Sequence, residues 1–150
     1  MGRPSMYLRE ILNSKGHTVH TIDSSATLED VVQKLVRHNC GSLVVVDPKS
    51  SSGRMVGIIT ERDILRACAS HKAALSALKV SDTMTANVVI GGPDDAVEDT
   101  MGLMTDKRIR HLPVMEEGQL LGLISLGDIV KMQHDQLTME NHYLKNYLHS

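Results

Sequence analysis

Aromatic side chains are nearly absent from this sequence. Its 150 residues include no Phe, no Trp and only three Tyr. The core must therefore be built from aliphatic side chains and Met, and the chain lacks the stacking platforms that bind single-stranded nucleic acids. Neither charge is in clear excess, because 16 basic residues stand against 18 acidic ones. Since non-specific binding to nucleic acids needs clustered Lys and Arg, we expect no nucleic-acid partner.

Long hydrophobic runs and cysteines are also scarce. The longest apolar run in the first half of the chain, Leu43–Val46, is far shorter than the ~20 residues that span a bilayer. Residues 1–11 alternate polar and apolar side chains, unlike a signal peptide. Cys40 and Cys68 are far apart in the sequence and are expected to be reduced thiols of an intracellular protein. The sequence thus predicts a soluble, cytoplasmic protein with no membrane partner.

The chain contains an internal repeat. Residues 19–46 of the first half align with residues 88–115 of the second, and the run Gly57–Ile64 aligns with Gly122–Ile129. The offset falls from 69 to 65 between these two alignments, because one Ser-rich loop, 47–53, is shorter in the second copy. A length change confined to a loop is what two copies of one structural unit tolerate best.

Both copies predict the same order of elements: strand, helix, strand, strand, helix. The expected strands are 19–22, 42–46 and 55–59 in the first copy and 88–90, 111–115 and 120–124 in the second. The expected helices are 28–38 and 97–107, with closing helices that begin near Thr60 and Ser125. Apolar residues at helical spacing form a stripe on the first helix, namely Leu28, Val31, Val32, Leu35 and Val36. Glu117-Gly118 is the expected hairpin turn of the second copy.

This order predicts a mixed α/β (α+β) fold of two β-α-β-β-α units. Neither unit covers both faces of its small sheet, so we expect the two to pack sheet to sheet about a pseudo-twofold axis. The predicted boundaries are 8–68 for the first repeat, 78–131 for the second and 132–150 for a C-terminal helical extension. That extension carries an imperfect apolar stripe, which either folds back on its own module or packs against a second copy.

The closing motifs Gly57–Asp63 and Gly122–Asp128 share the pattern Gly-hydrophobic-hydrophobic-Thr/Ser-x-x-Asp. Together with the element order and the run Ile109–Val114, they resemble a pair of CBS domains, often called a Bateman module. The resemblance covers nearly the whole chain, from about Leu8 to Lys131, as in the stand-alone members of the family. It implies a regulatory protein that binds an adenosine-containing ligand, such as AMP, ADP, ATP, NAD or S-adenosylmethionine, in clefts between the repeats. It also implies a homodimer and an unidentified regulated partner protein.

The residues of the first motif suit such a ligand on physical grounds. A carboxylate such as Asp63 can accept both hydroxyls of a ribose as charge-assisted hydrogen bonds. Thr60 is expected where a strand becomes a helix, so its hydroxyl and the free backbone N–H groups face an approaching anion. Arg62 adds a positive charge, and Val19, Ile22, Val44 and Ile59 are candidates for the apolar wall around adenine.

The two predicted sites differ in charge. Ser125 and Asp128 repeat the motif, but Gly127 replaces the arginine. Arg110 and His111 are candidates to reach a phosphate at the first site from the other repeat. We therefore expect a phosphate at the first site and a weaker or empty second site.

Structural explanations remain open for each of these residues. Thr60-x-x-Asp63 and Ser125-x-x-Asp128 also match a capping box, with Asp in place of Glu. Arg62 and Arg110 suit solvated surface charges, and His111 suits a packed strand residue.

The sequence indicates neither a metal site nor an enzyme. His17 and His20 lack a third ligand nearby, so no metal is expected, and no nucleophile-base-acid set indicates an enzyme. The main hypothesis is a regulatory sensor of adenine nucleotides. The alternative is a ligand-free interaction or stress-response protein whose clefts are vestigial.

Overall fold

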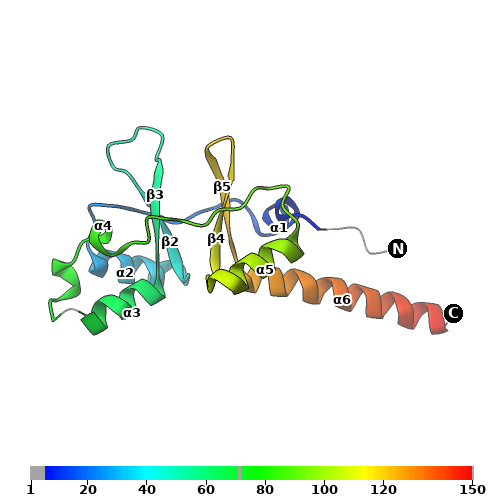
Figure 1. Ribbon diagram of the computed structural model, residues 1–150. Coiled ribbons are helices and arrows are strands. Elements are labelled where there is room, and N and C mark those ends of the chain that lie inside the picture. The colour runs from blue at the N-terminus through cyan, green and yellow to red at the C-terminus, as the bar shows by residue number, and fades with distance from the viewer. Residues whose placement is uncertain (1–5, 71, 150) are drawn as a thin grey trace. The chain divides into compact units, whose positions relative to one another are not determined.

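The computed structural model describes residues 6–70 and 72–149. The chain divides into two compact units, one formed by Thr18–Val89 and the other by Met1–His17 together with Ile90–Ser150 (Figure 1). We name them the Asp63 unit and the Asp128 unit after the last residue of the motif that each contains. Among the described residues, no helix is both long and apolar enough to cross a membrane.

The Asp63 unit is built on a three-stranded sheet in the order β1-β2-β3. Strand β1 pairs with β2 in parallel and β2 pairs with β3 in antiparallel fashion. The elements in chain order are β1 (Thr21–Asp23), α2 (Leu28–His38), β2 (Ser42–Val46), β3 (Met55–Thr60), α3 (Glu61–Ser70), the 3-10 helix η1 (Leu75–Ala77) and α4 (Val80–Thr83). The helix 28–38 and the strand 42–46 are confirmed at their predicted bounds. Strand β1 begins two residues later than predicted.

The Asp128 unit is built on the β4–β5 hairpin. Its elements are α1 (Leu8–Lys15), α5 (Val97–Lys107), β4 (His111–Glu116), β5 (Gln119–Ser125) and α6 (Leu126–His149). Glu117 and Gly118 form the predicted turn, with φ angles of 50° and 76°. In Figure 1 this turn is visibly shorter than the loop between β2 and β3.

The predicted strand 88–90 is wrong. The structure has only a single parallel bridge there, between Gly91 and Val114. The backbone of Gly91 makes two hydrogen bonds to β4, and then the chain turns at Gly92, whose N–H donates to the carboxylate of Asp95 at 2.8 Å. Pro93 follows and has no N–H to continue a ladder, so the pairing ends after one residue.

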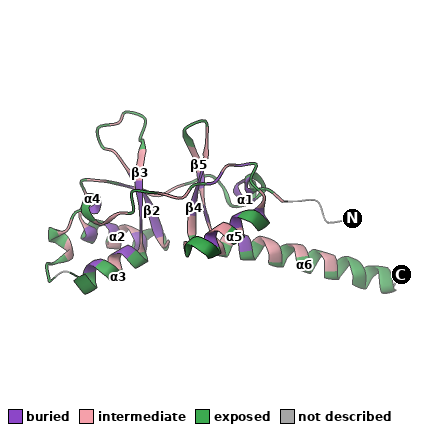
Figure 2. Ribbon diagram, viewed as in Figure 1, coloured by how far each residue is buried: buried purple, intermediate pink, exposed green. Residues whose placement is uncertain are grey.

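Aliphatic side chains form the core, as the scarcity of aromatic residues requires. In α2, Leu28, Val31 and Leu35 are buried against β2 and β3 in the core of the Asp63 unit. Val36, predicted to belong to the same stripe, is instead 76% exposed. It lies about 100° around the helix from Leu35, beyond the face that packs on the sheet. Figure 2 shows the buried residues gathered on the strands and on the inward faces of the helices.

Each unit includes a segment that precedes the other repeat in the sequence. In the Asp128 unit, the N–H of Leu8 donates to the carbonyl of Asp95 at 3.0 Å, next to a bridge between Tyr7 and Ala96. In the Asp63 unit, the N–H of Leu28 donates to the carbonyl of Leu78 at 2.9 Å. Residues 6–17 therefore pack with the second repeat, and residues 78–89 pack with the first.

Two equivalent glycines allow these segments to approach the sheets. A Cβ on Gly57 would lie 2.7 Å from the sulfur of Met84 and 2.8 Å from the carbonyl oxygen of Thr85. A Cβ on Gly122 would lie 2.6 Å from a methyl carbon of Leu12 on α1. The first residue of the repeated motif is thus glycine because a neighbouring segment occupies the space of a side chain.

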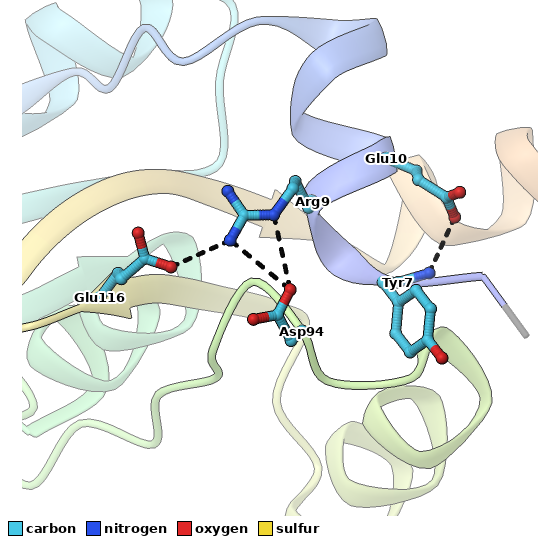
Figure 3. Close-up of polar contacts among 5 residues, drawn as sticks. All are labelled: Tyr7, Arg9, Glu10, Asp94 and Glu116. Atoms are coloured by element: carbon cyan, nitrogen blue, oxygen red, sulfur yellow. Dashed lines mark hydrogen bonds and ion pairs between the residues drawn. The ribbon is translucent and has the colours of Figure 1, made fainter.

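Ion pairs also connect α1 to the Asp128 unit (Figure 3). Arg9 contacts Glu116 on β4 at 3.0 Å and Asp94 at 3.5 Å. The hydrogen bond to Glu116 and the charge of Asp94 raise the pKa of Arg9. At the start of the helix, the backbone N–H of Tyr7 donates to the carboxylate of Glu10 at 2.9 Å. These contacts orient α1, whose last residue, Lys15, contacts Asp128 of the second motif.

Candidate functional site

Thr60 and Asp63 form a reciprocal pair where β3 becomes α3. The N–H of Thr60 donates to Asp63 Oδ2 at 2.9 Å, and the N–H of Asp63 donates to Thr60 Oγ1 at 3.4 Å. This is the predicted capping box. Thr85 Oγ1 lies 3.5 Å from the other carboxylate oxygen, Oδ1. Asp63 is only 7% exposed, although it is ionisable.

A hollow of about 300 Å³ lies beside Asp63. Polar side chains from α3 and from the segment around α4 line it, including Arg66, Ser70, Asp82 and Thr85. A buried carboxylate at the edge of a polar hollow can accept hydrogen bonds from a hydroxylated ligand.

A buried hydroxyl adjoins the same capping box. Ser42 on β2 is directly opposite Thr60 on β3, so the two side chains share one face of the sheet. Ser42 is 3% exposed, and within the described part of the chain its Oγ has no hydrogen-bond partner. Because buried polar atoms are usually satisfied, this hydroxyl is available to a ligand atom.

Ser125 and Asp128 repeat the capping box where β5 becomes α6. The N–H of Ser125 donates to Asp128 Oδ2 at 2.8 Å, and the N–H of Asp128 donates to Ser125 Oγ at 3.1 Å. This second carboxylate has an additional partner, because Lys15 Nζ lies 2.7 Å from the same oxygen. Burial by itself raises the pKa of Asp128, but the hydrogen bonds from Lys15 and Ser125 and the charge of Lys15 lower it below its ordinary value.

The other predicted site residues are distributed over both units. Arg62 is exposed on α3, and Arg110 is exposed just before β4. His111 is half-buried on β4, directly opposite Ser125, as Ser42 is opposite Thr60. That Arg110 and His111 reach a phosphate held at Thr60 and Asp63 stays a prediction.

Of the four residues predicted to contact adenine, Val44 on β2 and Ile59 on β3 are fully buried, and the other two lie at and before β1. Ile22 is 8% exposed and belongs to the core of the Asp63 unit. It also lines a second hollow of about 240 Å³, together with Asp23, Asp30 and Lys34. Val19 is half-buried in the segment that precedes β1.

Sequence reasoning missed Lys15, Thr85 and Arg66. Lys15 is 113 residues from Asp128, and no local pattern marks a lysine at the end of a short helix as the partner of that carboxylate. Arg66 was detectable in principle, because it follows Asp63 by three residues and therefore lies on the same face of α3. Thr85 lies in the segment 78–89, which precedes the second repeat in the sequence but packs with the first. The sequence does not indicate this packing.

No group of three or more metal-ligating side chains exists among the residues that the structure describes. The polar groups at both motifs are hydroxyls, backbone N–H groups and carboxylates. Such a set can bind a polar, hydroxylated ligand.

Two small α/β units, each closed by a hydroxyl-x-x-Asp capping box, define a tandem-repeat module. The chain belongs to the CBS domain family, which matches residues 8–70 and again residues 80–135. The CBS domain-containing protein CBSX3, mitochondrial, of Arabidopsis thaliana is 36% identical over 138 residues, which cover 87% of this chain and 66% of that protein.

Solved structures agree with this assignment. The chain is similar to the CBS-domain containing protein ATU1752 from Agrobacterium tumefaciens, with 35% identity, a TM-score of 0.81 and coverage of 89% of this chain and 97% of that one. It is also similar to the CBS domain pair of protein MJ0100, solved in complex with 5′-methylthioadenosine and S-adenosyl-L-methionine. That match has 26% identity, a TM-score of 0.77 and coverage of 89% of this chain and 99% of that one.

Proposed function

We propose that this protein is a regulatory sensor that binds an adenosine-containing ligand at Asp63 and thereby changes its affinity for a partner protein. Proteins of the CBS family are typically regulatory rather than catalytic. The observation that carries the proposal is the buried Asp63 carboxylate at the edge of a polar hollow. The adenosine compounds bound by the CBS pair of MJ0100 support the ligand class.

In this proposal, the ribose hydroxyls donate to Asp63 Oδ1, whose hydrogen bond from Thr85, at 3.5 Å, is long. Oδ2 keeps its role in capping α3. The unpartnered Oγ of Ser42 and the hydroxyl of Thr60 supply further polar contacts. AMP, ATP and NAD are the proposed ligands, with Arg62, Arg110 and His111 as phosphate contacts and with Val19 and Ile22 near adenine. Ser125 and Asp128 form the proposed second site.

Thermal melting in the presence of 5′-methylthioadenosine, AMP, ATP, NAD and S-adenosylmethionine tests the proposal. A ligand that binds only the folded state, at about 100 times its Kd, adds roughly 2.7 kcal/mol of stability and raises Tm. We expect a rise in Tm with at least one of these compounds. Its absence with all five would favour the alternative function, a ligand-free interaction protein.

The matched variants are Asp63→Ala and Glu10→Ala. Glu10 caps α1 as Asp63 caps α3, since the N–H of Tyr7 donates to its carboxylate at 2.9 Å. Both variants lose a cap, which costs about 1 kcal/mol. We expect only Asp63→Ala to lose the ligand-dependent rise in Tm, whereas a rise that survives in Asp63→Ala would contradict the assignment of Asp63.

We also propose that α6 pairs with a second copy of the chain. Beyond Gln136, this helix exposes large apolar side chains over three turns: Leu137, Met139, Tyr143, Leu144, Tyr147 and Leu148. Figure 2 shows this end of α6 as exposed. These side chains are 51–79% exposed, so together they offer a second copy a large part of the ~800 Å² that each partner buries in a standard protein interface. We expect Leu144→Glu with Tyr147→Glu to convert a dimer to a monomer in light scattering, and Lys145→Glu on the polar side to leave the dimer unchanged.

The proposed location of the protein is the cytoplasm.

A further inference from the structure

The two Asp residues of the repeated motif have different electrostatic environments. Asp63 accepts hydrogen bonds from the N–H and hydroxyl of Thr60 and a long one from the hydroxyl of Thr85. All of these donors are neutral. Asp128 accepts from the N–H of Ser125 and from the ammonium group of Lys15, both on Oδ2, at 2.8 and 2.7 Å. The second carboxylate therefore already has a counter-ion within the protein.

Lys15 and Thr85 make comparable contacts in their units. In the Asp63 unit, Thr85 exchanges two backbone hydrogen bonds with Ile58 on β3. In the Asp128 unit, Lys15 Nζ donates to the carbonyl of Leu123, the residue of β5 that corresponds to Ile58, at 2.7 Å. Lys15 thus connects the segment 6–17 to β5, and Thr85 connects the segment 78–89 to β3. Each of the two residues also contacts the motif carboxylate of its unit. One of them brings a hydroxyl to that carboxylate and the other a positive charge.

This difference changes which ligands the Asp128 unit can accept. The side chains of Lys15 and Asp128 are 34% and 23% exposed, so solvent screens their attraction only in part. A neutral ribose that donates both hydroxyls to Asp128 competes with the ammonium group and weakens its ion pair. A ligand with a phosphate beside the ribose supplies a new counter-ion for Lys15. A cationic ligand adds repulsion instead.

Resting on the proposed function, we propose that Lys15 is a specificity-determining residue that makes the Asp128 unit select anionic adenosine ligands over neutral or cationic ones. At the Asp63 carboxylate, Thr85 contributes a neutral hydroxyl instead of a counter-ion. This proposal revises the expectation drawn from Gly127, which attributed a weaker second site to the lack of a positive charge. Lys15 supplies that charge from a segment 113 residues away from Asp128.

The test follows the backbone amide NMR signals of Ser125 and Thr60, one reporter for each unit, during titrations of the full chain with adenosine and with AMP. In the wild type, we expect the Ser125 signal to respond to AMP with an affinity at least about tenfold higher than to adenosine. In Lys15→Met, we expect adenosine binding at Ser125 to strengthen and this preference to disappear. The responses of Thr60 should not change.

Two control variants separate charge from structure. Lys15→Arg keeps the positive charge and should keep the preference for AMP. Lys131→Met removes an exposed lysine from α6, one turn after Asp128, and should leave every affinity as in the wild type. Thermal melting without ligand checks that each variant is folded.

The outcomes are distinguishable. An unchanged preference at Ser125 in Lys15→Met, with a normal response at Thr60, overturns the role of Lys15 and leaves the proposed function intact. A wild-type Ser125 signal that responds equally to adenosine and AMP also overturns the role of Lys15 and leaves the proposed function intact. Silence of both reporters with both compounds overturns the proposed function and this inference with it.

Discussion

At the scale of single residues, one motif combines a structural and a candidate functional role. Thr60 and Ser125 cap the helices that follow them, and the carboxylates of Asp63 and Asp128 complete the caps. A cap uses only one carboxylate oxygen, so the other remains available as an acceptor. The motif alone does not determine what each carboxylate binds, because the third partner comes from a distant segment.

The Lys15–Asp128 ion pair makes stability depend on pH in acid. The folded-state pKa of Asp128 is below its unfolded value, so the stabilisation is present above the unfolded pKa and is lost as the pH falls through the folded pKa. We expect Lys15→Met to lower the free energy of unfolding at pH 7 by about 0.5–1 kcal/mol. Urea denaturation at pH 7 and at pH 2 measures the change, and the wild type and variant should converge at the lower pH. An equal difference at both pH values would mean that Lys15 acts through packing alone.

Alanine at Gly57 and at Gly122 tests how closely the segments 78–89 and 6–17 approach the strands β3 and β5. In Gly57→Ala the new methyl group meets the backbone oxygen of Thr85 at 2.8 Å, whereas in Gly122→Ala it meets only the flexible end of Leu12. We expect Gly57→Ala to cost about 2–3 kcal/mol and Gly122→Ala about 1 kcal/mol.

Gly102→Ala is the control, because Gly102 lies within α5 with no atom near its Cβ position. It should stabilise the protein by up to about 1 kcal/mol through helix propensity. Chemical denaturation of the three variants measures the order, and an equal loss in Gly57→Ala and Gly122→Ala would contradict the backbone clash.

At the scale of elements, the hairpin of the second repeat has a turn that its sequence suits only in part. Glu117 has a φ of 50°, a conformation that favours Asn or Gly, and Gly118 follows with 76°. We expect Glu117→Asn, which creates an Asn-Gly turn, to raise the free energy of unfolding by about 0.4–1 kcal/mol. Thermal melting measures this gain, and Gly118→Ala should have the opposite effect. A loss of stability in Glu117→Asn would show that the Glu side chain contributes more than the turn strain.

Local periodicity explains which elements were predictable from the sequence. The helices 28–38 and 97–107 are confirmed: the apolar stripe of the first indicates its bounds, and the repeat extends them to the second. The helices α1, η1 and α4 were not predicted, since three to eight residues offer too few turns for a clear period. The repeat predicts a strand at 88–90 by analogy with β1. In the structure, Gly91, Gly92 and Pro93 limit the pairing with β4 to a single bridge.

The candidate site was predictable only in its local part. The capping pairs follow from a spacing of three residues and are confirmed. The partners Thr85 and Lys15 lie 22 and 113 residues away from their carboxylates, and nothing in a short sequence window indicates such contacts. A single sequence therefore predicts equivalent carboxylates where the structure has two different ones.

At the scale of the whole molecule, the repeats of the sequence are not the compact units of the structure. The predicted boundaries 8–68 and 78–131 stay a prediction for the repeats, but the Asp63 unit is the continuous segment Thr18–Val89. The Asp128 unit needs α1, whose Leu8, Ile11 and Leu12 are all buried. A cut between the two sequence repeats would therefore remove a core helix from one unit and the α4 segment from the other.

We expect fragment 18–89 to fold alone and fragment 90–150 to fail. The first has its own core and all its elements, whereas the second leaves the surface that α1 covers open to water. Circular dichroism with thermal melting measures cooperative unfolding of each fragment. Addition of a peptide of residues 6–17 should restore cooperative melting to fragment 90–150. Cooperative unfolding of that fragment without the peptide would contradict the essential role of α1.

The division of the Asp128 unit between the two ends of the chain has a consequence for synthesis on the ribosome. Residues 18–89 can fold as soon as they leave the exit tunnel, while α1, which emerges before them, waits for strands and a helix that emerge after them. Until then, the three core side chains of α1 face solvent without their partners. The nascent chain is therefore the form of this protein most exposed to aggregation, and we expect chaperones to act on its N-terminal helix.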